Sequence, residues 1–142
     1  MAGINQAKCR KMIRAAFAKG KELGLQPLSV AVVDPGGHLI GFERQDGAAP
    51  GRFDIAYGKA NAAVMMGVPS SKMMERAEAQ AYFVTALGSA YDGKFIPVPG
   101  GVLVKDKKGV IMGALGVTGD TSDNDAACAV AGIEAASFSA EA

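Results

Sequence analysis

The sequence predicts an α+β domain in which helices surround an antiparallel sheet. Two observations lead to this fold class. Two pairs of short, Val-rich segments are each joined by a glycine-containing turn, and the strand–helix–strand alternation of a parallel sheet is missing. The predicted order of elements is α-β-β-α-α-β-β-α. Neither a linker nor an internal repeat interrupts the chain, so we expect residues 1–142 to form one domain.

The first helix and the first hairpin have the clearest sequence signals. Apolar residues recur three or four positions apart over residues 4–23, with Lys, Arg and Glu between them, and Gly24 and Pro27 end this amphipathic helix. The runs 28–34 and 38–44 are separated by Pro-Gly-Gly, which predicts a β-hairpin because glycine supplies the positive φ of a tight turn. Both runs are apolar on both faces, so we expect helices on both sides of the sheet.

The rest of the chain is predicted to form two more helices, a second hairpin and a last helix. A helix with an alanine-rich face ends before Pro69, and Ser70 or Ser71 can cap the helix that follows. Capping residues and acids between Thr121 and Asp125 favour the start of a last helix. The predicted elements are helices over residues 52–66, 70–87 and 124–138, a loop over 88–99, and a second hairpin formed by 102–105 and 110–117.

Charge and composition argue against several classes of function. The 142 residues hold 15 Lys and Arg against 14 Asp and Glu, with no basic run, which argues against binding to nucleic acid or to a membrane surface. A signal peptide and a membrane span are not expected, so we expect a cytoplasmic protein in which Cys9 and Cys128 are reduced. Small residues are abundant, with 26 Ala and 19 Gly, and only 6% are aromatic. We therefore expect apolar surface to be buried between the subunits of a homo-oligomer.

Few side chains can carry chemistry. His38 is the only histidine, and it is either an ordinary turn residue or the one imidazole available as an acid–base group or a metal ligand. A single His with scattered carboxylates makes neither a zinc site nor a Ser-His-Asp triad. Lys59, on the alanine-rich helix, is either solvated or aimed into a pocket. Arg44 lies near enough in sequence to Arg52 and Asp54 for an ordinary surface ion-pair set.

Three glycine-rich segments, residues 34–37, 99–101 and 113–119, either serve the hairpins alone or present backbone N–H groups to an anion. The last of them follows a strand and precedes a helix. Its GxxGxxG spacing differs from that of a dinucleotide-binding turn, and no βαβ unit surrounds it, so nicotinamide or flavin binding is not expected.

Three segments together resemble the GlcG/HbpS family of haem-degrading or haem-binding domains, which also occur fused to some cobalamin adenosyltransferases. They are VAVVDPGGHLIGFERQDGA (30–48), DIAYGKANAA (54–63) and VPGGVLVKDKKGVIMGALGVTGDTSDNDAACA (98–129), and the resemblance covers about residues 4–138. Thr118 stands where the family commonly has Ser. The resemblance implies a five-stranded antiparallel sheet with flanking helices, similar to profilin- and sensor-like folds, and assembly into dimers or larger rings.

Members of this family have different roles, so the resemblance leaves the function open. One hypothesis is that the protein binds haem or a related tetrapyrrole, as one unit of a homo-oligomer. His38 would then be the axial ligand of the iron or lie close to it, and Arg44 or Lys59 would pair with the propionates. Apolar strand and Met side chains would hold the macrocycle.

A second hypothesis is a cytoplasmic, cofactor-independent enzyme that acts on a small carboxylated catabolic intermediate. His38 or Asp34 would be the general base, the same two basic side chains would hold the carboxylate, and the amides of Gly100 and Gly101 would stabilise negative charge. A third is a non-catalytic assembly or regulatory module. The first two hypotheses require these groups to converge on one hollow.

Overall fold

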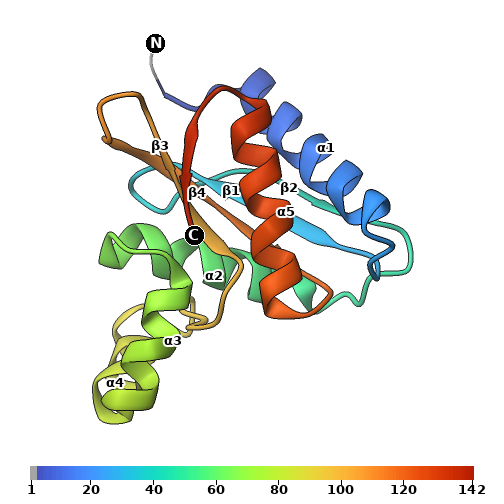
Figure 1. The fold of residues 1–142 in the computed structure, drawn as a ribbon. Coiled ribbons are helices and arrows are strands. Elements are labelled where there is room, and N and C mark those ends of the chain that lie inside the picture. The colour runs from blue at the N-terminus through green and yellow to red at the C-terminus, as the bar shows by residue number, and fades with distance from the viewer. Residues whose placement is uncertain (1–2) are drawn as a thin grey trace.

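The computed structural model describes residues 3–142, which form five helices and one five-stranded sheet (Figure 1). The elements in chain order are α1 (Gln6–Glu22), β1 (Ser29–Val33), β2 (Leu39–Arg44), α2 (Arg52–Met66), α3 (Ser70–Ala79), α4 (Ala81–Ala90), β3 (Gly101–Lys105), β4 (Ile111–Thr118), α5 (Ser122–Ala135) and β5 (Ser139–Glu141). The α+β prediction is confirmed. The helix expected over residues 52–66 has the predicted bounds.

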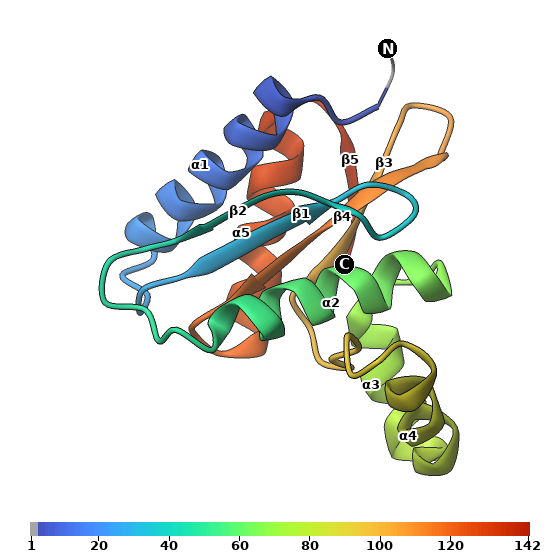
Figure 2. The same cartoon turned by 180° about the vertical axis from the view of Figure 1, so that it is seen from behind.

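The sheet is antiparallel throughout, in the order β2-β1-β4-β3-β5. Strand β1 pairs with both β2 and β4, so the two predicted hairpins join side by side in the middle of the sheet. Helices α1 and α5 cover one face and α2 covers the other, as the two opposite views show (Figures 1 and 2). This confirms that the apolar strands need cover on both sides.

The larger core lies between the sheet and the α1–α5 pair. Thr121 caps α5, because its side chain accepts a hydrogen bond from the Asn124 amide at 3.3 Å. Cys9 and Cys128 are free and buried in this core, and burial raises the pKa of both thiols to about 11, so both stay protonated at neutral pH. The largest buried side chains here are Met12, Ile13, Leu28, Leu115 and Ile133.

Helix α2 packs on the opposite face with its backbone close to the strands. Gly101 and Gly116 lie opposite each other on β3 and β4, and we call them the glycine pair. A Cβ atom at position 116 would overlap the carbonyl oxygen of Ala56, and one at position 101 would overlap that of Lys59. Part of the small-residue content therefore serves close packing inside the chain, between α2 and the sheet.

The structure differs from the sequence prediction in two places. The segment 70–87 forms two helices, because Gln80, with φ −143° and ψ 66°, interrupts it, and α3 and α4 project from the sheet below α2 (Figure 2). The last helix ends at Ala135 instead of residue 138. Ser137 takes a left-handed φ of 66°, and the chain turns back as β5, which pairs with β3. This is the fifth strand that the family resemblance implies.

Candidate functional site

The turn between β1 and β2 holds the only histidine next to a carboxylate. The Asp34 carboxylate accepts hydrogen bonds from the amides of Gly36 and His38, both at 2.9 Å. Both carboxylate oxygens also lie 3.1 Å from Nδ1 of the His38 ring. This arrangement follows from the Asp-Pro-Gly-Gly sequence, because an Asp side chain readily bonds the amide two residues further on and Gly37, with φ +80°, takes the left-handed conformation.

The electrostatics of the turn keep Asp34 ionised. Burial alone would raise the pKa of this carboxyl group, but the amide hydrogen bonds and the His38 ring outweigh burial and hold it below the ordinary value of 3.8. An ionised carboxylate only accepts hydrogen bonds, so Nδ1 of His38 carries a hydrogen and Nε2 of the neutral ring presents its lone pair. The His38 side chain is 82% exposed, which leaves Nε2 accessible to a ligand.

The turn between β3 and β4 has the same hydrogen bonds without a histidine. The Asp106 carboxylate accepts from the amides of Lys108 and Val110 at 2.8 and 2.9 Å, and the Asp106 amide donates to the Val110 carbonyl at 3.0 Å. In the first turn the Asp34 amide donates to the His38 carbonyl at 2.9 Å in the same way. Val110 is therefore the counterpart of His38, and the turn conformation does not require an imidazole.

A hollow lined by aromatic side chains lies next to the first turn, and we call it the aromatic hollow. Phe53 and Tyr57, one helical turn apart on α2, stack with their ring centroids 5.8 Å apart, and the Tyr57 hydroxyl donates to the Gly37 carbonyl at 2.8 Å. The hollow measures about 530 Å³, within the common range of about 300–1,000 Å³ for small-molecule sites. Its lining residues are Leu39, Phe53, Asp54, Tyr57, Asp92, Gly93 and Lys94.

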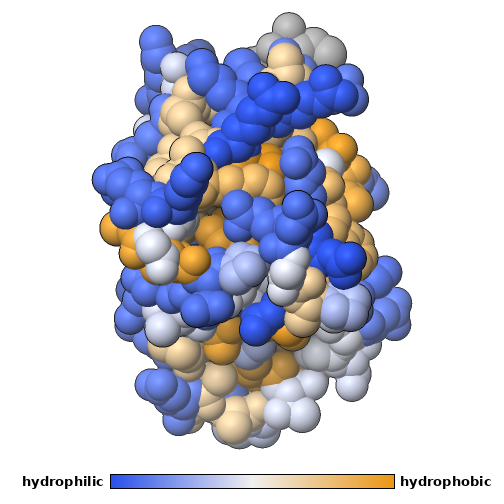
Figure 3. Space-filling model, turned by 90° about the vertical axis from the view of Figure 1, so that its right-hand side faces the viewer, coloured by the Kyte–Doolittle hydropathy of each residue, from blue (hydrophilic) through white to orange (hydrophobic). Residues whose placement is uncertain are grey.

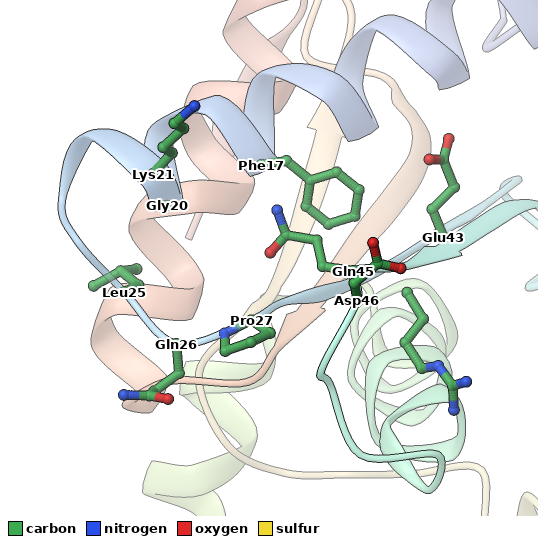
Figure 4. A pocket seen from close by; sticks show the side chains of 10 residues that line it. Phe17, Gly20, Lys21, Leu25, Gln26, Pro27, Glu43, Gln45 and Asp46 are labelled. Atoms are coloured by element: carbon green, nitrogen blue, oxygen red, sulfur yellow. The ribbon is translucent and has the colours of Figure 1, made fainter.

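Arg44 lies at the opposite end of β2 from His38. The two residues are six positions apart along extended backbone, about 20 Å at the usual rise per residue. Arg44 lines another hollow of about 580 Å³, between the end of α1 and β2, whose walls include Phe17, Lys21 and Gln45 (Figure 4). Asp54 forms no ion pair with Arg44 or with Arg52 within residues 3–142, so the surface ion-pair set expected from the sequence is wrong.

Lys59 is buried in the protein, only 2% exposed. Its Nζ donates to the Val117 carbonyl at 2.9 Å and to the Asp125 carboxylate at 3.1 Å, and the other oxygen of Asp125 accepts from the Asp120 amide at 3.0 Å. Burial lowers the pKa of Lys59, and the Asp125 charge offsets part of that effect. Lys59 is therefore neither solvated nor aimed into a pocket. It ties α2 to the start of α5.

In the Pro-Gly-Gly segment at residues 99–101, the Gly101 amide and the Gly100 carbonyl have partners inside the protein. The Gly101 amide donates to the Ser70 hydroxyl at 2.7 Å, and that hydroxyl donates to the Val98 carbonyl at 2.6 Å. The Gly100 carbonyl accepts from the Val117 amide at 2.9 Å. Both glycines are buried beside Lys59. The convergence of all these groups on one hollow, expected from the sequence, therefore does not occur within one chain. His38 and Asp34 lie together at the β1–β2 turn, whereas the other predicted site residues that lie together, Lys59 and the two glycines, are buried elsewhere.

The site contains residues that sequence reasoning missed. Phe53 and Tyr57 have the i, i+4 spacing of side chains on one helix face, which could have identified them. No local sequence pattern identified Lys94, because its position at the hollow depends on a contact with a distant residue. The Asn61 side chain donates a hydrogen bond to the Lys94 carbonyl at 2.8 Å. The described part of the chain contains no group of three or more His, Cys, Asp or Glu that could hold a metal ion. Among residues 3–142 there is also no helix with the length and apolar character needed to cross a membrane.

Comparison with known proteins places this geometry in a family. The family described as haem-degrading protein HbpS-like matches residues 4–134. The crystal structure of HbpS is 30% identical, with a TM-score of 0.81, and the match covers 94% of this chain and 90% of that one. A double mutant of Streptomyces reticuli HbpS is also 30% identical, with 94% and 87% covered and a TM-score of 0.78.

A structure described as a PduOC–heme complex has the same fold, with a TM-score of 0.86 and 23% identity over 99% of this chain and 100% of that one. No curated protein matches the chain. The family match extends over nearly all of the described residues. The chain belongs to the haem-degrading HbpS-like family.

Proposed function

We propose that the protein binds haem or a related iron tetrapyrrole at the β1–β2 turn, with Nε2 of His38 as the iron ligand. The observation that carries the proposal is the Asp34–His38 pair, in which the carboxylate and the ring nitrogen lie 3.1 Å apart. The β3–β4 turn makes the corresponding backbone hydrogen bonds with Val110 in place of His38. A turn that folds without an imidazole leaves the imidazole free for a ligand.

The residues around His38 fit such a ligand. Histidines that bind metals commonly donate their second ring N–H to a carboxylate, which fixes the tautomer and raises the basicity of the ligating nitrogen, and Asp34 is placed to do this. The stacked rings of Phe53 and Tyr57 offer apolar contact to a flat macrocycle. Lys94 is exposed and supplies a positive charge for a propionate. Bound haem would supply an iron centre with intense visible absorption.

The test is a titration of the purified protein with hemin, followed by the Soret band. We expect saturable binding by the natural protein and loss of the iron–imidazole spectrum in His38→Val, a variant that copies the residue of the β3–β4 turn. The exchange should leave the fold intact, and circular dichroism checks this. Equal spectra and affinities for a folded His38→Val variant would show that His38 is not the ligand.

A pair of matched variants tests the role of the carboxylate. Asp34→Asn should weaken hemin binding by about 10–100-fold, the usual effect of losing a partner that orients a metal ligand. Asp106→Asn removes the same carboxylate from the β3–β4 turn and should leave binding unchanged. If both variants weaken binding equally, the effect comes from the turns and not from the imidazole.

The basic residue that pairs with the haem propionates indicates where the tetrapyrrole binds. If it occupies the aromatic hollow of one chain, Lys94→Ala weakens hemin binding and Arg44→Ala does not. The opposite result would favour a site between subunits, because Arg44 is about 20 Å from His38 along β2. Arg44 would then pair with a propionate, as expected from the sequence, at a site formed by two subunits.

The Asp34–His38 pair also favours a second function, acid–base catalysis on a small carboxylated substrate. Asp34 orients the His38 ring for proton transfer, as a general base needs, and the aromatic hollow beside it is large enough for such a molecule. This hypothesis predicts that small carboxylates, without hemin, raise the melting temperature of the natural protein but not of His38→Val. A protein that neither hemin nor carboxylates stabilise would be an assembly or regulatory module.

We also propose that the protein is a homo-oligomer, as the family resemblance implies. Four large apolar side chains are well exposed on the described chain: Leu23, Leu39, Tyr82 and Val110, between 45% and 73%. Contact with other subunits would cover such side chains. Native mass spectrometry of freshly purified protein reports the number of subunits and any retained ligand, and a purely monomeric spectrum would overturn this proposal.

A further inference from the structure

Helix α1 concentrates positive charge that the balanced composition of the chain conceals. Six of the 15 Lys and Arg residues lie on it, against one acid, Glu22. Its buried residues face the core, so the basic residues gather on the outer side of the molecule. Figure 3 looks onto the side where α1 lies, and hydrophilic side chains dominate the upper part of that face. The basic residues of α1 are Lys8, Arg10, Lys11, Arg14, Lys19 and Lys21.

The outer side of α1 is hollowed next to α5, and we call this hollow the basic groove. It measures about 630 Å³ and is lined by four alanines and three cations. Arg10, Lys11 and Arg14 are exposed, and none of them pairs with an acid among residues 3–142. The remaining lining residues are Ala7, Ala15, Ala18 and Ala135.

The dimensions and chemistry of the basic groove select among anionic partners. Anionic lipid surfaces bind clusters of about 4–8 Lys and Arg residues. Of the six on α1, Lys19 pairs with Glu22 and Lys8 lies over the Phe138 ring, and only three cations line the groove. Single-stranded nucleic acid needs aromatic side chains on which bases stack, and the groove has none among its described lining residues. The distance between packed helices depends on the side chains at the contact, and the four alanines of the groove allow a helix of a partner protein to approach closely.

The spacing of the cations matches an acidic helix. Arg10 and Arg14 are four residues apart on α1, a rise of about 6 Å. Acidic residues at positions i and i+4 of a partner helix have the same spacing, so two carboxylates can meet the two guanidinium groups at once. We propose that the basic groove docks an acidic, alanine- or leucine-rich helix of a partner protein.

The experiment compares two peptides of identical composition. The probe is an alanine-rich helical peptide with Glu at positions i, i+4 and i+8, and the control peptide carries the three Glu residues on different faces. Binding to the full chain is followed by amide chemical shifts at low ionic strength. We expect the probe to perturb the amides of Ala7, Ala15, Ala18 and Ala135, and to bind about tenfold more tightly than the control peptide.

Charge-reversal variants provide the second comparison. Arg10→Glu/Arg14→Glu should weaken binding of the probe by about tenfold or more, and both side chains are exposed, so the fold should be retained. Lys107→Glu/Lys108→Glu makes the same change of net charge on the β3–β4 turn and should alter binding by less than about twofold. Equal binding of the two peptides, or equal weakening by the two variants, would overturn the proposal. So would binding to phosphatidylserine vesicles by a protein that does not bind the probe.

Discussion

Ser29 and Ser70 are both fully buried, yet the same substitution should change stability in opposite directions. The Ser29 hydroxyl on β1 is the one buried side-chain polar atom without a hydrogen-bond partner among the described residues. The Ser70 hydroxyl accepts from the Gly101 amide at 2.7 Å and donates to the Val98 carbonyl at 2.6 Å. We therefore predict that Ser29→Ala stabilises the protein and that Ser70→Ala destabilises it.

The magnitudes follow from the partners that each hydroxyl has. A buried polar group without a partner costs about 1–3 kcal/mol, and the small space left by the oxygen offsets part of the gain, so Ser29→Ala should raise the free energy of unfolding by about 1 kcal/mol. Ser70→Ala removes two hydrogen bonds and leaves the buried Gly101 amide unpaired, which should cost about 2 kcal/mol. The two variants should differ by about 3 kcal/mol.

Urea unfolding monitored by circular dichroism measures both values, with an unchanged dependence on denaturant as the check that the unfolded states are alike. For a chain of this length a difference of about 3 kcal/mol corresponds to about 10 °C in melting temperature. If Ser29→Ala is destabilised as much as Ser70→Ala, then the Ser29 hydroxyl has a partner in solution and the reasoning from unsatisfied groups is refuted.

Three further predictions concern packing and charge. Gly116→Ala should cost about 3 kcal/mol or more because the new Cβ overlaps the α2 backbone, whereas Gly88→Ala, in open space on α4, should stabilise by about 0.5–1 kcal/mol; calorimetry compares them. Lys59→Met leaves Asp125 buried without its cation and should cost about 3–5 kcal/mol in chemical unfolding, more than the double variant Lys59→Met/Asp125→Leu. Because the folded-state pKa of Asp34 is lowered, its stabilisation is present above the ordinary value of 3.8 and lost as pH falls through the folded value. The stability difference between the natural protein and Asp34→Asn should therefore disappear in acid, as unfolding curves between about pH 7 and 2.5 would show.

Local signals predicted most of the secondary structure. The bounds of α2 follow from Pro69 and the alanine repeat, and both hairpins follow from turns in which Asp bonds the backbone. The break at Gln80 has no such signal, because neither Pro nor Gly is adjacent. Strand β5 is only three residues long and exists through its pairing with β3, which local sequence does not encode.

The site was harder to predict because its groups depend on distant partners. Asp125, the residue that pairs with the buried charge of Lys59, is 66 positions away in sequence. Arg44 and His38 are neighbours on one strand in the sequence, but the extended backbone carries them to opposite ends of β2. The balanced net charge likewise gave no indication of the basic groove. A helix places its residues on different faces according to their spacing, and the overall composition does not contain that spacing.

The glycine pair has a consequence for ligand binding that reaches beyond packing. Helix α2 carries Phe53 and Tyr57 of the aromatic hollow as well as Lys59, and its depth on the sheet is set by the missing side chains at positions 101 and 116. Because α2 packs this closely on the sheet, its packing fixes the position of the two aromatic rings relative to the His38 imidazole. Substitutions at positions 101 and 116 should therefore alter affinity at the proposed site by displacing α2 from the sheet.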